Sequence, residues 1–112
     1  MDKHEALQQY FGHATFRDGQ EEVVDAILQG RDVLGIMPTG AGKSVCYQLS
    51  AMLLSGLTIV ISPLISLMKD QVDSLLEIGI SAAYLNSSMD AGEYQVTMLQ
   101  ARQGIYRILY VA

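Results

Sequence analysis

The sequence has little of what marks secreted or generally basic proteins. It contains one cysteine, Cys46, so an internal disulfide is impossible and a disulfide-stapled secreted scaffold is excluded. Two prolines are present, and we find no Pro-rich linker, low-complexity tract or internal repeat. Seven lysines and arginines stand against twelve acidic residues, a net charge of −5, which excludes a surface that holds nucleic acid by general positive charge.

Targeting and membrane signals are also missing from the sequence. No apolar signal-peptide core follows residues 1–5. An uncharged stretch covers residues 44–68, long enough to span a bilayer, but turn signals at Ser55-Gly56 and Ser62-Pro63 divide it into helix, strand and helix. We therefore expect no membrane contact and a cytoplasmic location, close to the nucleoid if the source is bacterial.

What the sequence does contain is an alternation of helices and apolar strands. Half of its 112 residues are hydrophobic, which predicts a packed globular core. Asp18 with Glu21, and Ser62 with Pro63, are predicted to begin helices. The pattern predicts helices at residues 2–10, 18–30, 44–54, 62–77 and 90–102, and strands at 33–36, 57–61, 82–85 and 105–111. Such alternation is typical of βαβ units, so we predict an α/β fold with a mostly parallel sheet flanked by helices.

A glycine-rich segment, residues 37–44, follows the first predicted strand and opens a helix, which is where a phosphate-binding loop must lie. Glycines let its backbone turn tightly and aim N–H groups at phosphate oxygens, and the helix dipole adds to the attraction. We expect Lys43 to reach the β- and γ-phosphates as the catalytic cation and the Ser44 hydroxyl to ligate Mg²⁺. The predicted nucleotide contacts are Met37, Pro38, Thr39, Gly40, Ala41, Gly42, Lys43 and Ser44.

This loop departs from the general pattern G-x-x-x-x-G-K-[ST], because Met37 stands where the first glycine is expected. The departure argues against generic small kinases and G-proteins. Two alternatives stay open on the residues alone: a glycine-rich turn that carries a lysine by chance, and an unrelated P-loop enzyme such as a small-molecule kinase.

Residues 37–40 (MPTG) are the first sign that the sequence resembles RecQ-type DNA helicases, superfamily 2 motors built from two RecA-like lobes, and the resemblance covers about residues 11–112. Residues 11–20 (FGHATFRDGQ) are similar to the adenine-reading motif 0, residues 62–72 (SPLISLMKDQV) to motif Ia, and residues 85–88 (LNSS) to motif Ib. The resemblance implies a helical segment with motif 0 at residues 1–31, followed at 32–112 by a truncated first RecA-like lobe with motifs I, Ia and Ib.

The motif 0 resemblance implies three adenine-site residues. The amide of Gln20 donates and accepts at once, which suits the N6 and N7 edge of adenine. Arg17 is expected to contact phosphate or clamp the motif, and His13 stands where the family usually carries a stacking tyrosine. The alternatives are a polar residue on a first helical turn for Gln20 and a solvated charge for Arg17.

Polar residues follow two of the predicted strands, at the carboxyl ends where open α/β sheets bind ligands. Hydroxyl and N–H groups there can hold a DNA backbone phosphate without reading sequence. The predicted DNA contacts, favoured by the resemblance, are Ser62, Pro63, Lys69, Gln71, Asn86 and Ser87. The alternatives are a well-capped amphipathic helix with an exposed lysine, and a plain turn.

Parts that ATP hydrolysis needs are missing from these residues. No apolar strand ends in an Asp that could supply a second metal-binding carboxylate, and no Asp-Glu-Ala-His box is present. The resemblance implies part of an ATP-dependent 3′-to-5′ helicase of DNA recombination and repair. Its expected partners are single-stranded or forked DNA and the rest of the helicase chain, including the second lobe with its arginine finger. For the chain alone we expect weak Mg-ATP binding at most and negligible turnover, so a nucleotide-binding fragment without turnover is the alternative.

Overall fold

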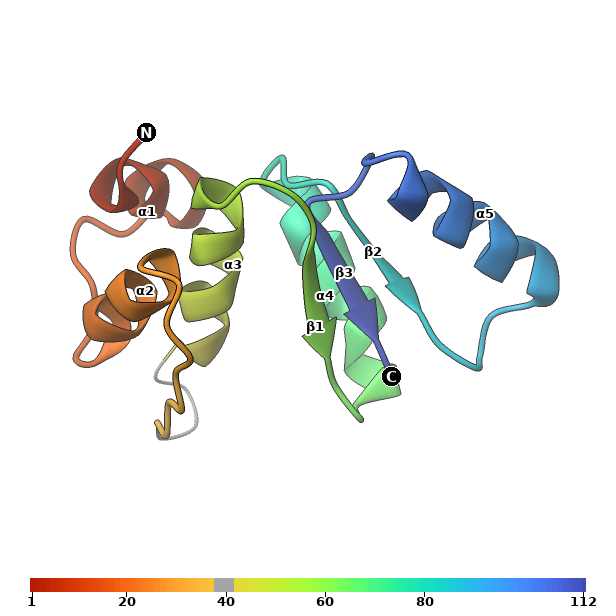
Figure 1. Ribbon diagram of the computed structural model, residues 1–112, viewed down its shortest axis with the longest axis horizontal. Coiled ribbons are helices and arrows are strands. Elements are labelled where there is room, and N and C mark those ends of the chain that lie inside the picture. Colours follow the sequence, from red (N-terminus) through yellow and green to blue (C-terminus); the bar gives the residue numbers. More distant parts are fainter. Residues whose placement is uncertain (38–41) are drawn as a thin grey trace. The chain divides into compact units, whose positions relative to one another are not determined.

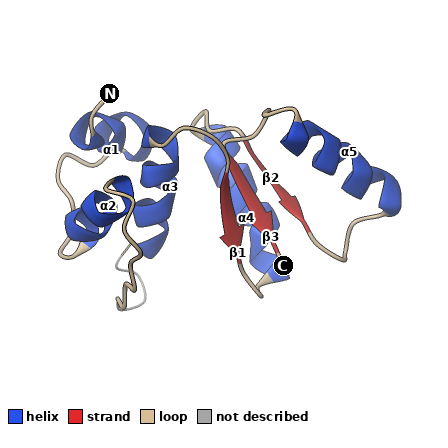
Figure 2. Cartoon of the chain, viewed as in Figure 1, coloured by secondary structure: helices blue, strands red, loops and turns tan. Residues whose placement is uncertain are grey.

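The computed structural model describes residues 1–37 and 42–112. Within this described part, three helices come first, and strands and helices alternate after the third helix (Figures 1 and 2). They are α1 (Lys3–Phe11), α2 (Gln20–Leu28), α3 (Lys43–Leu53), β1 (Thr58–Ile61), α4 (Ile65–Glu77), β2 (Ala82–Leu85), α5 (Ala91–Arg102) and β3 (Ile108–Val111). The chain divides into two compact units, Met1–Ser55 and Gly56–Ala112.

The first unit is helical, with α3 packed against both α1 and α2. Its core consists of buried apolar side chains from all three helices: Ala6, Leu7, Val24 and Leu49. Helix α1 begins where the Asp2 carboxylate accepts a hydrogen bond from the Glu5 N–H at 2.9 Å, and it ends at Gly12 with a left-handed φ of 72°. Glycine adopts this conformation without the steric cost that other residues meet.

The predicted cap of α2 is wrong. The N-cap is Gly19, with a φ of 85°, and it makes no side-chain hydrogen bond to the helix. Asp18 therefore stands one residue outside the position from which a carboxylate accepts the first-turn N–H groups. The left-handed glycine starts α2 directly at Gln20, which sets the position of that side chain.

The second unit is a sheet of three parallel strands in the order β1-β3-β2. Helices α4 and α5 connect the strands, and both contact β2. The unit buries side chains from α4, including Met68, Val72 and Leu75, and the β3 residues Ile108, Leu109 and Tyr110. The predicted α/β fold with a parallel sheet flanked by helices is confirmed.

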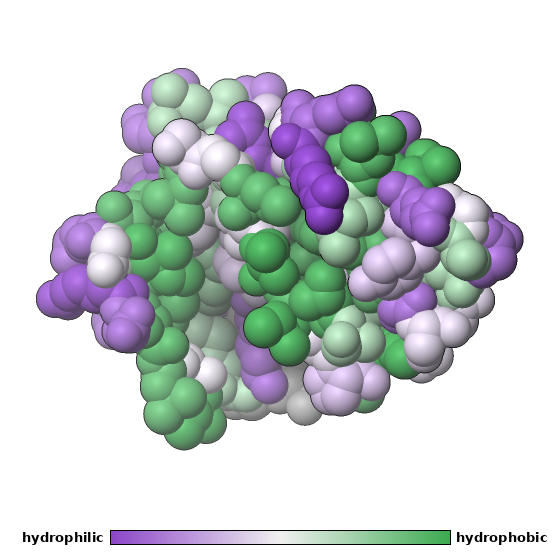
Figure 3. All heavy atoms as spheres, turned by 45° about the vertical axis from the view of Figure 1, so that its right-hand side comes forward, coloured by the Kyte–Doolittle hydropathy of each residue, from purple (hydrophilic) through white to green (hydrophobic). Residues whose placement is uncertain are grey.

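The predicted strand at residues 33–36 is wrong, because this run is irregular and exposed. Leu34 is 88% and Ile36 87% exposed. A parallel strand needs neighbours for its N–H and C=O groups, and the strands of the described chain pair only with one another. One face of β1 is also uncovered within its unit, since Ile61 is 81% exposed. Hydrophobic residues therefore gather at the surface (Figure 3).

Candidate functional site: a nucleotide-binding junction and a strand edge

The first candidate site joins motif 0 to the start of α3. Gln20 is the first residue of α2 and only 4% exposed. Its Oε1 accepts a hydrogen bond from the Arg17 N–H at 2.8 Å, and its Nε2 donates to the Gly42 carbonyl oxygen at 3.0 Å. The side chains of His13 and Arg17 are exposed. One buried amide thus connects the predicted adenine motif to the residue that precedes α3.

Gly42 is required at this junction for two reasons. Its φ is +78°, a left-handed conformation that costs an L-residue about 1–2 kcal/mol. A Cβ built on Gly42 would also overlap Gln20 Nε2. As the N-cap of α3, Gly42 has no side chain to accept from the first-turn N–H groups, so backbone geometry leaves these donors for a ligand.

Lys43 and Ser44 are the first two residues of α3. Lys43 is exposed and Ser44 is half-buried, so both lie where a phosphate at the helix N-terminus would meet them. Met37 is half-buried, and its Cε lies 3.5 Å from the position of a Cβ on Gly19, next to motif 0. Four of the predicted contacts, Pro38, Thr39, Gly40 and Ala41, lie outside the described residues.

A cavity of about 360 Å³ adjoins Lys43 in the same unit. It is lined by Val23 and Ile27 of α2, by the segment that leads into the loop, and by Cys46 and Tyr47 of α3. Burial raises the pKa of the Cys46 thiol. The cavity beside Lys43 is therefore lined by a thiol that burial keeps protonated and by apolar side chains, together with the charged Arg31 and Asp32.

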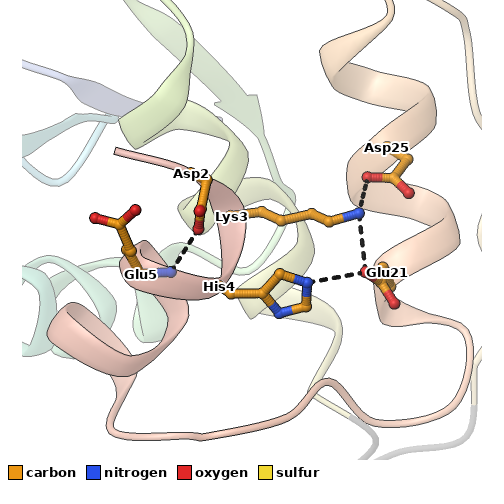
Figure 4. A network of polar contacts seen from close by, with 6 residues as sticks. All are labelled: Asp2, Lys3, His4, Glu5, Glu21 and Asp25. Atoms are coloured by element: carbon orange, nitrogen blue, oxygen red, sulfur yellow. Dashed lines mark hydrogen bonds and ion pairs between the residues drawn. The ribbon is translucent and has the colours of Figure 1, made fainter.

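Contacts that sequence reasoning missed tie α1 to α2 (Figure 4). Lys3 Nζ lies 2.8 Å from Glu21 Oε2 and 2.6 Å from Asp25 Oδ1. His4 also lies with its Nε2 3.3 Å from Glu21 Oε2. The hydrogen bonds that Lys3 donates to the carboxylates of Asp25 and, to a smaller extent, Glu21 raise the pKa of Lys3. The paired residues lie 17 to 22 positions apart in the sequence, and spacing carries no signal at that range.

The second candidate site is the carboxyl edge of the sheet in the second unit. The Ser62 N–H donates to the Val111 carbonyl oxygen at 2.9 Å, and the Ala112 N–H donates to the Leu85 carbonyl oxygen at 3.4 Å. These bonds bring the residues after β1 and after β2 to the same edge. The segments that carry Ser62 and Asn86 therefore share one side of this unit.

The predicted cap at the start of α4 is wrong. The helix begins at Ile65 with Leu64 as N-cap, whereas Ser62 and Pro63 were predicted to begin it. The Ser62 Oγ accepts from the Leu64 N–H at 3.2 Å, and the Ile65 N–H donates to the Pro63 carbonyl oxygen at 3.2 Å. A tight turn over residues 62–65 takes the place of a first helical turn. The exposed Pro63 lies on this turn.

The other predicted DNA contacts differ in their surroundings. Lys69 is exposed on α4 and pairs with Asp73 at 2.8 Å, a hydrogen bond that raises the pKa of Lys69. Gln71 is half-buried and Ser87 is exposed.

Asn86 is buried: its Oδ1 accepts from the Ser88 N–H at 2.9 Å, and its Nδ2 donates to Met68 Sδ at 3.7 Å. The Asn86 side chain thus shapes the turn after β2.

Among the residues that the structure describes, no three or more His, Cys, Asp or Glu side chains gather into a metal-binding group. Over the same residues, every helix is too short or too polar to cross a membrane.

Comparison with known proteins identifies the family. The model for DEAD/DEAH box helicases matches residues 17–112. The ATP-dependent DNA helicase RecQ of Pasteurella multocida is 56% identical over 108 residues, which are 96% of this chain and 17% of that protein. RecQ of Bacillus subtilis is 49% identical over 106 residues, 94% of this chain and 18% of that protein.

A eukaryotic relative also matches nearly the whole of this chain over a small part of its own length. The ATP-dependent helicase wrn-1 of Caenorhabditis elegans is 45% identical over 106 residues, 95% of this chain and 10% of that protein. The chain thus spans less than a fifth of the length of these three relatives. The family that motifs 0, I, Ia and Ib suggested is confirmed: the chain belongs to the RecQ-type DEAD/DEAH box helicases.

Proposed function

We propose that this chain is the N-terminal part of the first RecA-like lobe of an ATP-dependent 3′-to-5′ DNA helicase that acts in recombination and repair. The observation that carries the proposal is the hydrogen bond from Gln20 to Gly42. It links a base-reading motif to a phosphate-binding helix start, a combination that a nucleotide site needs. The printed names of the relatives, ATP-dependent DNA helicases, support ATP and DNA as the ligands.

On the nucleotide side, residues 37–44 hold the phosphates of ATP. The first-turn N–H groups of α3 face the β-phosphate, and the exposed Lys43 ammonium neutralises charge that develops during transfer. The Ser44 hydroxyl is the one protein ligand to Mg²⁺ that we assign. Gln20, which accepts from the Arg17 N–H, reads the adenine edge, and Arg17 and His13 are assigned to the same site. Because Gln20 also contacts Gly42, base and phosphate recognition meet at one side chain.

On the DNA side, the carboxyl edge of the sheet in the second unit holds the backbone of a single strand. Ser62, Pro63 and Ser87 meet the phosphates, and Lys69 and Gln71 on α4 add to them. Asn86 acts by holding the turn that presents Ser87, since its own amide is buried against Met68 and Ser88. These contacts do not read bases, so binding is independent of sequence and sensitive to salt.

The full-length protein supplies the sheet neighbours and the catalytic groups that these two units lack. The exposed apolar run at residues 33–36 and the uncovered face of β1 fit a larger sheet in which both are buried. In that lobe, residues 1–31 form the motif 0 segment and residues 32–112 the motor segment. A second carboxylate and an arginine from further chain are needed for turnover, so these 112 residues alone bind Mg-ATP weakly and hydrolyse it negligibly.

The test is DNA-stimulated ATP hydrolysis by the full-length protein. We expect single-stranded DNA to raise the hydrolysis rate, and Lys43→Ala to abolish the rate with and without DNA. A P-loop kinase would not respond to single strands. ATP hydrolysis that ignores DNA, or that survives Lys43→Ala, would contradict the proposed function.

A further inference from the structure

We propose that Lys3 is a positioning residue for adenine recognition: α1 holds the first turns of α2 through Lys3 and thereby places Gln20. The inference rests on the proposed role of Gln20 in reading the base. Selectivity for adenine then depends on α1, a helix that precedes motif 0 and that does not contact the nucleotide in our assignment.

The main contact is one ammonium shared by two carboxylates on one face of α2. Lys3 Nζ lies 2.8 Å from Glu21 Oε2 and 2.6 Å from Asp25 Oδ1 (Figure 4). The two acidic residues are four positions apart, so they lie one above the other on the helix. A cation that holds both restricts the rotation of α2 about its axis. The Lys3 side chain is 24% exposed, so water competes less than at an open surface pair.

A second contact from α1 reaches both α2 and the motif 0 segment. His4 Nε2 lies 3.3 Å from Glu21 Oε2, and the His4 ring meets the Phe16 ring edge-on at a centroid distance of 5.5 Å. Phe16 precedes Arg17, whose N–H donates to Gln20 Oε1. At the other end of the motif, the His13 N–H donates to the Leu7 carbonyl oxygen at 3.4 Å. Helix α1 therefore holds the adenine motif at both ends.

The position of Gln20 follows from these contacts. Gln20 immediately precedes Glu21 and donates to Gly42 across 3.0 Å. A helix turns by about 100° per residue, so even a partial rotation of α2 would carry the Gln20 amide out of reach of Gly42. The protein groups that bind the phosphates belong to α3, and their positions do not depend on the rotation of α2. Loss of the Lys3 charge should therefore weaken base selectivity more than phosphate binding.

The unit should stay folded without the Lys3 charge. Its core of Ala6, Leu7, Val24 and Leu49 is fully buried and contains no part of Lys3. Surface and half-buried ion pairs contribute modestly to stability. Lys3→Met keeps the length of the side chain and removes the charge, and Lys3→Arg keeps the charge.

The experiment measures the dissociation constants of Mg-ADP and Mg-GDP for the full-length protein by calorimetry. We expect Lys3→Met to weaken Mg-ADP binding about fivefold and leave Mg-GDP binding unchanged, so that the preference for adenine falls. Lys3→Arg should restore the preference. The double variant Glu21→Gln, Asp25→Asn should lower it as Lys3→Met does.

Asp2→Ala is the matched control for a merely structural role. It removes the hydrogen bond from the Glu5 N–H that caps α1, yet it leaves Lys3 and its partners in place. We expect lower thermal stability and an unchanged ratio of the two dissociation constants. If Asp2→Ala lowers the adenine preference as much as Lys3→Met, the positioning role is wrong.

Gln20→Ala separates this inference from the proposed function. If Gln20→Ala lowers the adenine preference and Lys3→Met does not, the inference is wrong and the proposed function stands. If Gln20→Ala leaves the preference intact, the adenine assignment fails, and the inference fails with it because Lys3 then has nothing to position.

Discussion

Gln20 Nε2 lies 3.0 Å from the carbonyl oxygen of Gly42, so the start of α2 is hydrogen-bonded to the N-cap residue of α3. Gly42 tolerates this approach because it has no Cβ. The predicted base-reading motif and the predicted phosphate-binding helix are thus joined through one buried amide. The consequences can be tested at both residues and at the neighbouring charges.

Gly42→Ala should destabilise the first unit and weaken nucleotide binding. The left-handed φ costs alanine about 1–2 kcal/mol, and the new methyl group displaces Gln20. We expect a total loss of about 2–4 kcal/mol in the free energy of unfolding, measured with urea. The matched control is Gly30→Ala, with the same φ of +78° and nothing within 4 Å of the added Cβ. Equal losses for the two variants would argue against a steric role of Gln20.

Lys43→Ala should remove the cation from the predicted phosphate site. Because the ammonium stabilises charge in the transition state, we expect the kcat/KM of ATP hydrolysis by the full-length protein to fall by at least about a hundredfold. Arg102→Ala removes one positive charge from an exposed position in the last turn of α5 and serves as the control. An Arg102→Ala protein as inactive as Lys43→Ala would point to a general charge effect.

Lys69 and Asp73 should influence DNA binding in opposite directions. Lys69→Ala removes a predicted phosphate contact, so affinity for single-stranded DNA should fall and the slope of log Kd against log salt should decrease by about one. Asp73→Asn removes the carboxylate that holds Lys69 at 2.8 Å, so affinity should rise at low salt. Filter binding across a salt series measures both effects. Unchanged slopes in both variants would remove Lys69 from the DNA site.

Cys46 should react slowly with alkylating reagents in the folded protein. Burial raises its pKa, so the thiolate that reacts is scarce at neutral pH. Iodoacetamide modification of Cys46, followed by peptide mass spectrometry, should be at least about tenfold slower in the folded than in the guanidinium-unfolded protein. Equal rates would show that α3 opens readily at this position.

The raised pKa of Cys46 also predicts that the free energy of unfolding depends on pH. The folded state holds the thiol proton more tightly than the unfolded state does. The resulting stability is complete below the unfolded pKa of about 8.5 and is lost as the pH rises through the raised folded value. Cys46→Ala should therefore show a smaller decrease in the free energy of unfolding above pH 8.5. Parallel pH curves for the two proteins would contradict this.

Local pattern was sufficient for much of the second unit. The β-branched run before Ser62 became β1, and the predicted strand at 82–85 coincides with β2. Asp90 caps α5 by accepting from the Glu93 N–H at 2.8 Å, as expected of an aspartate before a helix. These features depend on groups within a few residues of one another, and sequence spacing encodes them directly.

The predicted helix caps were wrong where the backbone conformation before the helix decided at which residue the helix begins. Gly19 took the N-cap that Asp18 was predicted to occupy, and a turn at Ser62 delayed α4 to Ile65. The run at residues 33–36 has the composition of a buried strand, yet it finds no neighbour within the described chain. A strand forms only with a partner, and composition does not supply one.

The amino-acid sequence alone was enough for the α/β class, because alternating helices and apolar strands leave a local pattern, and the resemblance of its motifs was enough for the family. Tertiary structure alone decided that Lys3 holds Glu21 and Asp25, that Gln20 reaches Gly42, and that Asn86 turns inward against Met68. These partners lie 18 or more residues apart, and their distances depend on how the helices pack.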